Sequence, residues 1–260
     1  ETRFGAEHLR DEALGLKTRA ETTVRPTLHR GGFEAMATSL ALDGFVAEPT
    51  AYGAARVSGP GDPFASKAFK TGLFTPQDPA SLAVVELMDV KPQETVLDLC
   101  AGRGVKATAL ADRGAKVLAV DIEGRKLKAA LGLARRLGVD GALTARTADA
   151  ADPSVALGQF DHVLVDAPCT GLGTLRKHPE IAWRRRPEDV RRLSELQHAL
   201  ITSGARHVRS GGSLVYAVCT FTNGESSVPN LPGFILEEPV LSTRPSEGYD
   251  SFFACRWRRE

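Results

Sequence analysis

Two cysteines stand where this sequence could support chemistry. Cys169 follows the apolar run 161–166 after an Ala-Pro dipeptide, and Cys219 directly follows the apolar run 213–218. If these runs are neighbouring parallel strands, both thiols lie together at the carboxyl edge of the sheet, where such proteins bind ligands. A single cysteine is usually an inert buried hydrophobe. A pair that faces one ligand pocket instead predicts a functional role for both sulfurs.

A glycine-rich turn lies in the stretch 95–121, which is typical of a strand, a turn, a helix and a second strand. Gly102 and Gly104 allow the backbone to approach a ligand without a Cβ in the way. Asp121 closes the second strand about twenty residues past the turn, where an acid can accept hydrogen bonds from ribose hydroxyls. Asp98, at the end of the first strand, stands where S-adenosylmethionine enzymes commonly keep an acid. The stretch therefore predicts a nucleotide-binding βαβ unit.

The glycine turn by itself leaves two alternatives open. Gly102-x-Gly104-x-x-Ala107 would also serve as a loose dinucleotide fingerprint, as in a nicotinamide dehydrogenase. A tight turn that binds nothing would show the same pattern. A dehydrogenase, however, would leave the paired cysteines unexplained.

Regular alternation of strand and helix patterns positions these residues. The expected strands are 95–99, 116–120, 142–147, 161–165 and 213–218, and the expected helices are 104–112, 123–137 and 187–208. Alternation of this kind predicts an α/β fold, in which a mainly parallel, Rossmann-like sheet is covered by helices on both faces. Ligands then bind at the carboxyl ends of the strands.

Residues 1–63 predict a small α+β subdomain ahead of this sheet, and residues 64–260 predict the main domain. The Gly- and Pro-rich segment 58–63 is typical of a linker. The elements expected in the subdomain are a helix near 6–16, strands at 22–29, 45–47 and 54–57, and a helix over 33–42. Asp78 and Pro79 predict the N-cap and first residue of a further helix.

The composition is ordinary for a soluble globular protein, with 42% hydrophobic and 25% charged residues. No apolar run approaches the eighteen or so residues of a membrane helix, so we expect no membrane partner. Four cysteines without metal-ligand spacing or disulfide density predict a reducing, cytoplasmic setting, no metal, and inert roles for Cys100 and Cys255. The net charge of +1 leaves any case for nucleic acid to local basic patches. We expect a monomer.

Several motifs together resemble one known family, the Sun/RsmB (NOL/NOP) RNA cytosine-C5 methyltransferases. The motifs are QDPAS at 77–81, DLCAGRGVK at 98–106, DAPCTGLG at 166–173, RKHPEIAW at 176–183, LVYAVCTF at 214–221 and the ending GYDSFFACRWRR. The resemblance runs from about residue 20 to the end, and it implies a Rossmann-like methyltransferase fold. Such proteins carry an N-terminal NusB-like helical domain. Its absence here, with no initial methionine, would suit a fragment or a short form.

The resemblance implies covalent catalysis. Cytosine C5 is a poor nucleophile, and a thiolate that adds at C6 makes C5 able to attack a methyl donor. In the family, the cysteine that matches Cys219 is the nucleophile, and the one that matches Cys169 assists its release. Asp166 would contact the N3 edge of the base, and Lys106 is expected to lower the pKa of the nucleophilic thiol. The implied substrate is RNA, with 16S ribosomal RNA first and tRNA as the alternative.

The same resemblance implies S-adenosylmethionine as the cofactor. The family pattern places the methionine portion on the glycine turn, the ribose on Asp121 and the adenine amino group on Asp149. Asp166 would border both cofactor and base. The implied residues of the turn are Cys100, Ala101, Gly102, Arg103, Gly104, Val105 and Lys106.

A basic stretch with one aromatic residue follows the Cys169 motif. Its composition suits phosphate contacts and base stacking beside the pocket, and the target base must be unpaired or flipped out to reach a thiol. The expected RNA-binding residues are Arg176, Lys177, His178, Trp183, Arg184, Arg185 and Arg186. The small subdomain would hold flanking RNA, and a mere packing extension of the main domain is the alternative.

The sequence departs from the family pattern near both ligand-binding motifs. Arg103 stands where the family usually has proline, and Val105 where it has glycine. Val218 precedes the nucleophile in place of threonine, and the segment 222–225 is a reduced form of Pro-x-Glu-Asn-Glu. An altered turn would suit a non-catalytic RNA-binding ribosome assembly factor that keeps the fold. The retention of both cysteines favours the enzyme.

Overall fold

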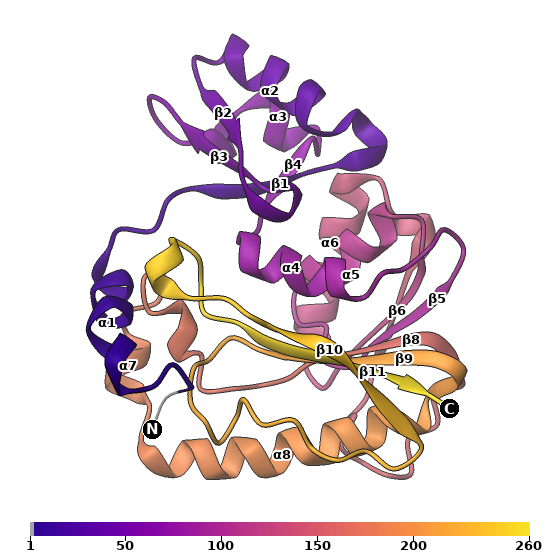
Figure 1. The fold of residues 1–260 in the computed structure, drawn as a ribbon. Coiled ribbons are helices and arrows are strands. Elements are labelled where there is room, and N and C mark those ends of the chain that lie inside the picture. The colour runs from indigo at the N-terminus through magenta and orange to yellow at the C-terminus, as the bar shows by residue number, and fades with distance from the viewer. Residues whose placement is uncertain (1–2) are drawn as a thin grey trace.

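The computed structural model describes residues 3–260. They form a main domain, in which a seven-stranded sheet lies between helices, and a smaller unit with a four-stranded sheet (Figure 1). The strands of the large sheet are β5 (Thr95–Asp98), β6 (Lys116–Asp121), β7 (Leu143–Thr147), β8 (Phe160–Asp166), β9 (Val208–Val218), β10 (Phe234–Ser242) and β11 (Phe253–Arg259). They lie in the order β10-β11-β9-β8-β5-β6-β7. β5 to β9 pair in parallel, and β10 and β11 are antiparallel additions at one edge. The predicted α/β fold class is confirmed.

The chain reverses its direction of winding beside β5. The next strand, β6, pairs on one side of β5, whereas β8 pairs on the other side. A crevice opens at such a reversal, at the carboxyl ends of the two central strands. Asp98 ends β5 and Asp166 ends β8, so the fold carries both acids to this crevice.

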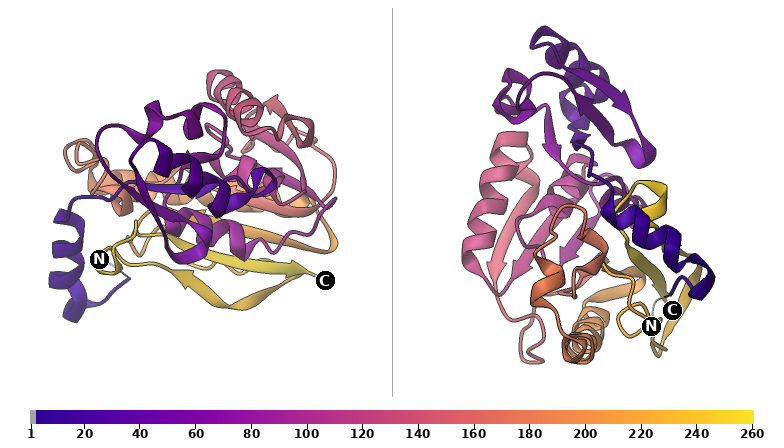
Figure 2. Two further views of the ribbon diagram at one scale, coloured as in Figure 1. Left: turned by 90° about the horizontal axis from the view of Figure 1, so that it is seen from above. Right: turned by 90° about the vertical axis from the view of Figure 1, so that its left-hand side faces the viewer.

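Helices cover both faces of the large sheet, as Figures 1 and 2 show. On one face, α4 (Pro79–Leu87), α5 (Val105–Asp112) and α6 (Gly124–Leu137) bury Val84, Leu110 and Leu137 against the strands. On the other face, α8 (Pro187–Arg206) buries Leu200 and Ile201. Alternate residues of each strand contribute to the hydrophobic cores on the two faces of the sheet, because successive side chains of a strand point to opposite faces. No helix within residues 3–260 is long and apolar enough to cross a bilayer.

The small unit is an antiparallel sheet packed under two helices. Its strands are β1 (Thr23–Pro26), β2 (Val46–Pro49), β3 (Ala55–Ser58) and β4 (Phe74–Pro76), in the order β2-β3-β1-β4, and its helices are α2 (Gly32–Leu42) and α3 (Lys67–Lys70). Met36, Leu40 and Phe74 form the centre of its core. Because β4 completes this sheet, the unit extends past the predicted boundary at residue 63.

The first helix belongs elsewhere. α1 (Leu9–Lys17) lies away from the small sheet, beside the C-terminal 3₁₀ helix η7 (Pro245–Glu247) (Figure 1). The buried Glu12 carboxylate accepts hydrogen bonds from Ser246 N (3.1 Å) and Ser246 Oγ (2.9 Å). The sequence pattern predicts the helix but not its partner, since the contact joins opposite ends of the chain.

Three strands, β4, β10 and β11, have no counterpart among the elements predicted from local patterns, although β11 lies in the ending GYDSFFACRWRR quoted for the resemblance. β4 is only three residues long. β10 is an edge strand that carries Glu237, Glu238 and Pro239. All of its residues are partly buried or exposed. Charged residues and proline are usual on an edge strand, but they remove the apolar alternation by which a strand is recognised. The other expected elements lie within a few residues of their predicted bounds.

A buried arginine joins the small unit to helix α5 of the main domain. The Arg25 guanidinium of β1 donates to Asp112 Oδ2 (3.1 Å), Gln77 Oε1 (2.9 Å) and Thr108 Oγ1 (3.2 Å). The side chains of Arg25 and Asp112 are 3% and 0% exposed. His29 Nδ1 lies 2.6 Å from the other oxygen of Asp112. The two parts of the chain are thus held by a desolvated ion pair with further hydrogen bonds.

We expect Arg25→Met to lower the free energy of unfolding by about 3–5 kcal/mol, because it leaves the Asp112 carboxylate buried without its cation. Urea unfolding followed by circular dichroism measures this. The matched control is Arg56→Met, since Arg56 makes exposed ion pairs with Glu21 and Glu48 and such pairs contribute little. Equal midpoints for the two variants would contradict the structural role of Arg25.

Candidate functional site

Cys169 and Cys219 meet at the carboxyl edge of the large sheet. Cys169 follows β8 and Cys219 follows β9, and these strands pair directly, with Asp166 opposite Ala217. The two Sγ atoms are 3.3 Å apart, and both residues are partly buried. The predicted proximity of the thiols is confirmed, whereas their chemical roles remain predictions.

The contact between the thiols affects the acidity of Cys169. The hydrogen bond with Cys219 and burial raise the pKa of Cys169 well above its ordinary value, and the Glu225 carboxylate adds to the rise. A thiol with a raised pKa stays protonated near neutral pH and attacks poorly. This direction agrees with the assisting role that the family resemblance implies for Cys169.

Lys106 provides the positive charge of the site. Its Nζ atom lies 2.7 Å from Asp166 Oδ2, and its side chain is 10% exposed. Burial lowers the pKa of Lys106, but the Asp166 carboxylate and a negative sulfur at Cys219 outweigh burial and raise it. The ammonium also lies 4.8 Å from the centre of the Phe252 ring. Lys106 is thus paired with Asp166, and its charge lies within electrostatic range of Cys219.

Asp98 is a buried acid of this site. It is 1% exposed, and no hydrogen-bond partner in residues 3–260 reaches its Oδ1 atom. Burial and the nearby Asp166 carboxylate raise the pKa of Asp98 to about 7. An unpartnered buried carboxylate is costly, so this oxygen suits a cationic or hydrogen-bond-donating ligand.

The raised pKa of Asp98 makes stability depend on pH. In the unfolded chain an aspartate titrates near about pH 4, so between that pH and about 7 the folded state binds more protons. The contribution of this proton is complete at low pH and is lost as the pH rises through 7. We expect wild type to lose about 2 kcal/mol relative to Asp98→Asn between about pH 5 and pH 8. Urea unfolding of both proteins at the two pH values measures this, and parallel pH profiles would contradict it.

The two glycines of the turn are needed for different structural reasons. Gly102 has φ +54° and open space where a Cβ would stand, and its N–H donates to Asp121 Oδ2 (2.9 Å). A Cβ at Gly104 would lie 2.5 Å from the Ala130 methyl group of α6. Gly104 therefore permits close packing of α5 on α6, and only Gly102 leaves its side open. The exposed Arg103 lies between them.

A cavity of about 340 Å³ opens beside this turn. Its acidic lining includes Asp121 at the end of β6 and Asp149 after β7, and Cys100 also faces it. Its apolar walls come from Leu99 and Pro168, which lie inside quoted motifs, and from Ile122, Leu196 and Leu200, which the sequence patterns do not single out. Ile122, which is 65% exposed, lies on the wall of the cavity. A cavity of this size with few polar groups is typical of a small-ligand site.

The remaining turn residues are placed by the backbone. Ala101 N donates to Val120 O (2.9 Å), and Val105 begins α5. Burial raises the pKa of Cys100 well above its ordinary value, as do the acids around it. Cys100 thus faces the cavity as a neutral thiol, and Cys255 is buried in β11. Among residues 3–260 no cluster of three or more His, Cys, Asp or Glu side chains could hold a metal ion.

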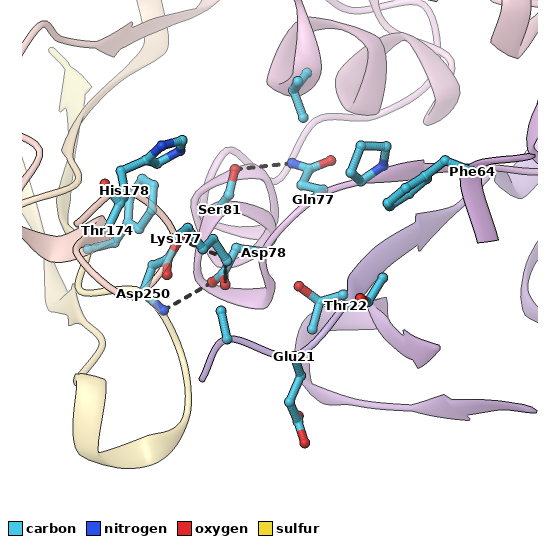
Figure 3. A pocket seen from close by; sticks show the side chains of 15 residues that line it. Glu21, Thr22, Phe64, Gln77, Asp78, Ser81, Thr174, Lys177, His178 and Asp250 are labelled. Atoms are coloured by element: carbon cyan, nitrogen blue, oxygen red, sulfur yellow. Dashed lines mark hydrogen bonds and ion pairs between the residues drawn. The ribbon is translucent and has the colours of Figure 1, made fainter. Parts of the chain in front are cut away.

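A second cavity, of about 620 Å³, lies between the small unit and the main sheet (Figure 3). Lys177 enters it and binds Asp250 (2.8 Å) and Asp78, the N-cap of α4. The Arg176 side chain, 4% exposed, lies 3.6 Å from Asp250. Both cations are therefore engaged by carboxylates: Arg176 and Lys177 join the loop to Asp250, and Lys177 also joins it to the start of α4.

The rest of the basic stretch is more exposed. Trp183 is 92% exposed on the short helix α7 (Ile181–Arg184). His178, Arg184 and Arg186 are exposed as well. Arg185 donates to the carbonyl oxygen of Thr170 (2.8 Å), directly after Cys169. Contacts with RNA by this stretch remain predictions, and Trp183 with its neighbouring arginines is the part that is free to make them.

A family model described as 16S rRNA methyltransferase RsmB/F matches residues 85–230. The chain belongs to this RsmB/F family. Among the curated relatives, ribosomal RNA small subunit methyltransferase B of Thermus thermophilus is 40% identical over 201 residues, covering 71% of this chain and 50% of that protein. The Escherichia coli protein of the same name is 38% identical over 164 residues, covering 62% of this chain and 38% of that protein.

The RsmB/F assignment agrees with the resemblance seen in the motifs. The chain spans half or less of the length of these two relatives. A solved methyltransferase homologue from Pyrococcus horikoshii superimposes with a TM-score of 0.85 and 22% identity, covering 98% of this chain and 91% of that one. At this identity the likeness supports the Rossmann-like methyltransferase fold.

Three residues of this RsmB/F chain contact the site although the motifs gave them no role. Phe252 lies beside Lys106, and Glu225 accepts a hydrogen bond from Thr170 N (2.8 Å). Arg3 donates to the carbonyl oxygens of Thr220 and of Phe252 (2.7 Å). Glu225 lies in the reduced motif 222–225 and Phe252 in the ending GYDSFFACRWRR, and these positions are what the sequence offers for finding them. Nothing in the local sequence marks Arg3.

Proposed function

We propose that this chain binds S-adenosylmethionine and methylates C5 of a cytosine in RNA, with 16S rRNA as the substrate. The observation that carries the proposal is the contact between the Cys169 and Cys219 sulfurs beside the Lys106–Asp166 pair. The RsmB/F family assignment supports the RNA substrate, since the matching family is described as 16S rRNA methyltransferases. Cytosine C5 as the target rests on the paired thiols.

The residues around the first cavity fit this cofactor, which supplies an electrophilic methyl group when bound. Asp121 and Asp149 line the cavity and offer acceptor oxygens to the ribose hydroxyls and the adenine amino group. The unpartnered Oδ1 of Asp98 suits the ammonium group of the methionine portion. Among the turn residues Cys100 to Lys106, Gly102 leaves open space for close approach.

In the proposed reaction, the Cys219 thiolate forms a bond to cytosine C6, and the electron pair of the C5–C6 double bond moves towards C5. The Lys106 ammonium stabilises the thiolate before attack, and Asp166 contacts the N3 edge of the base. After C5 has gained its methyl group, a base removes the C5 proton. The electron pair restores the double bond and expels Cys219 as a thiolate. Cys169 lies 3.3 Å from the leaving sulfur and stands ready to assist this step.

The test is methyl transfer from radiolabelled S-adenosylmethionine to unmodified 16S rRNA, with tRNA as a parallel substrate. Nucleoside mass spectrometry identifies the product. We expect 5-methylcytidine in the 16S rRNA. Methylation of tRNA alone would reassign the substrate, and cofactor binding without transfer to either RNA would support a non-catalytic assembly factor.

A further inference from the structure

Glu225 is a buried acid to which the proposed reaction gives no task. It is 1% exposed and lies between the loops that carry the two cysteines. On the Cys169 side, Glu225 Oε1 accepts from Thr170 N (2.8 Å), and Oε2 accepts from Thr170 Oγ1 (2.6 Å). Both hydrogen bonds are short, and the bond from the hydroxyl has the length expected for a charged acceptor. The residue directly after Cys169 is thus held twice.

The same carboxylate holds the Cys219 loop. Glu225 Oε2 accepts from Thr222 Oγ1 (2.7 Å) and from Thr220 Oγ1 (3.3 Å), the residue directly after Cys219. The Thr170 and Thr220 hydroxyls are themselves 2.8 Å apart, and both threonines are fully buried. One carboxylate therefore contacts the residue that follows each cysteine.

Helix α8 closes the network from a third side. Gln197 Nε2 donates to Glu225 Oε1 (3.2 Å) and to the carbonyl oxygen of Pro168 (2.9 Å), directly before Cys169. Tyr216 donates its hydroxyl to the backbone oxygen of Glu225 (2.7 Å). Cys169 is thus fixed on both sides along the chain, and its loop is anchored to both the sheet and α8.

The charge of Glu225 is matched by the groups around it. A carboxylate has only acceptor sites, and the groups that face Glu225 are N–H or O–H donors. Its negative charge is among the causes that raise the pKa of Cys169, after the bond to Cys219 and burial. Glu225 therefore acts on Cys169 through its charge, while its hydrogen bonds reach both cysteine loops.

We infer that Glu225 is a positioning residue, which holds the Cys169 and Cys219 loops in register so that the two sulfurs stay in contact. The inference rests on the proposed cysteine chemistry for its functional meaning. Glu225 acts through Thr170, Thr220 and Thr222 and touches neither sulfur's reacting partner. Glutamine in its place presents an amide N–H₂ to some of these donors, so it retains the size of the side chain but breaks part of the network.

The experiment measures how readily the two sulfurs join. Diamide oxidises two neighbouring thiols to a disulfide and itself takes up the two electrons and two protons. We compare its rate in wild type, Glu225→Gln and Thr170→Val, using peptide mass spectrometry to follow the Cys169–Cys219 bond. The matched control is Glu12→Gln, a buried glutamate of α1 that binds Ser246. Alkylation of the buried Cys255 reports global unfolding in every sample.

We expect disulfide formation to slow at least about tenfold in Glu225→Gln and less in Thr170→Val. Glu12→Gln should keep the wild-type rate, and Cys255 should stay protected throughout. A wild-type rate in folded Glu225→Gln and Thr170→Val would overturn the inference. Slowing only in samples where Cys255 is alkylated would also overturn it, because Glu225 would then act on overall stability alone.

A second readout separates this inference from the proposed function. In the methylation assay, Glu225→Gln should lower kcat about 10- to 100-fold and leave the KM for S-adenosylmethionine unchanged, because the cofactor cavity does not include Glu225. If wild type methylates no RNA, the proposed function fails, and the diamide comparison still decides the positioning role. Equal loss of kcat and cofactor affinity would contradict positioning.

Discussion

The substitution Cys219→Ser is expected to lower the rate of methyl transfer at least about 10³-fold, because a serine hydroxyl is a far weaker nucleophile than a thiolate. Serine in place of Cys169 is expected to have a different result. Attack by Cys219 still proceeds, but release is impaired, so a covalent protein–RNA adduct accumulates. The opposite effects follow from the roles that the family resemblance implies for the two cysteines. The raised pKa of Cys169, caused by its contact with Cys219 and by burial, agrees with a thiol that assists and does not attack.

A denaturing gel with S-adenosylmethionine and 16S rRNA measures both variants and the double mutant. The slow-migrating adduct should build up in Cys169→Ser and be absent wherever Cys219 is replaced. Cys255→Ala is the matched control, since that cysteine is buried in β11 and has no predicted role in binding or catalysis. An adduct that requires Cys169 and survives the loss of Cys219 would reverse the two roles. No adduct with any RNA would favour the non-catalytic alternative.

Lys106→Met is expected to lower kcat by about 10²- to 10³-fold, because it removes the buried positive charge that stabilises the Cys219 thiolate. Methionine fills a similar volume beside Phe252, so the fold can be retained. Without the ammonium, the carboxylates of Asp98 and Asp166 face each other uncompensated, which raises the pKa of Asp98 further. The measurement is kcat for methylation together with the rate of alkylation of Cys219 as a function of pH.

In Lys106→Met, alkylation of Cys219 should require a higher pH than in wild type. Lys91→Met is the control for the loss of a lysine, because Lys91 forms an exposed ion pair with Asp89 away from the site. Thermal unfolding of both variants tests the fold. A near-wild-type kcat in folded Lys106→Met, or an unshifted alkylation profile, would remove Lys106 from the proposed mechanism.

Local patterns predicted most of the main sheet and the edge at which its ligands lie. Apolar runs identified β5 to β9, since buried parallel strands carry near-continuous apolar residues. The rule that ligands bind at carboxyl ends of strands then brought Asp98, Asp121, Cys169 and Cys219 to one edge. β10 was missed because its charged residues and proline hide the alternation of an edge strand.

The basic stretch 176–186 shows what composition alone does not predict. Composition predicts seven RNA-binding residues there, and it treats their charges alike. In the folded chain, Arg176 and Lys177 are engaged by Asp250, and Lys177 also by Asp78. A cation that becomes buried needs a partner, and that partner comes from a distant part of the chain. Exposure therefore depends on the fold, and Trp183 retains it while Arg176 does not.

Strand periodicity and strand ends are local properties, so they predicted which residues could react and at which edge of the sheet these residues lie. How the residues are held depends on packing between distant segments. This packing placed Phe252 beside Lys106 and put the Glu225 carboxylate between two cysteine loops. These contacts join segments far apart along the chain, and their partners are selected by the burial of charged and polar groups during packing. No spacing pattern within one segment contains that information.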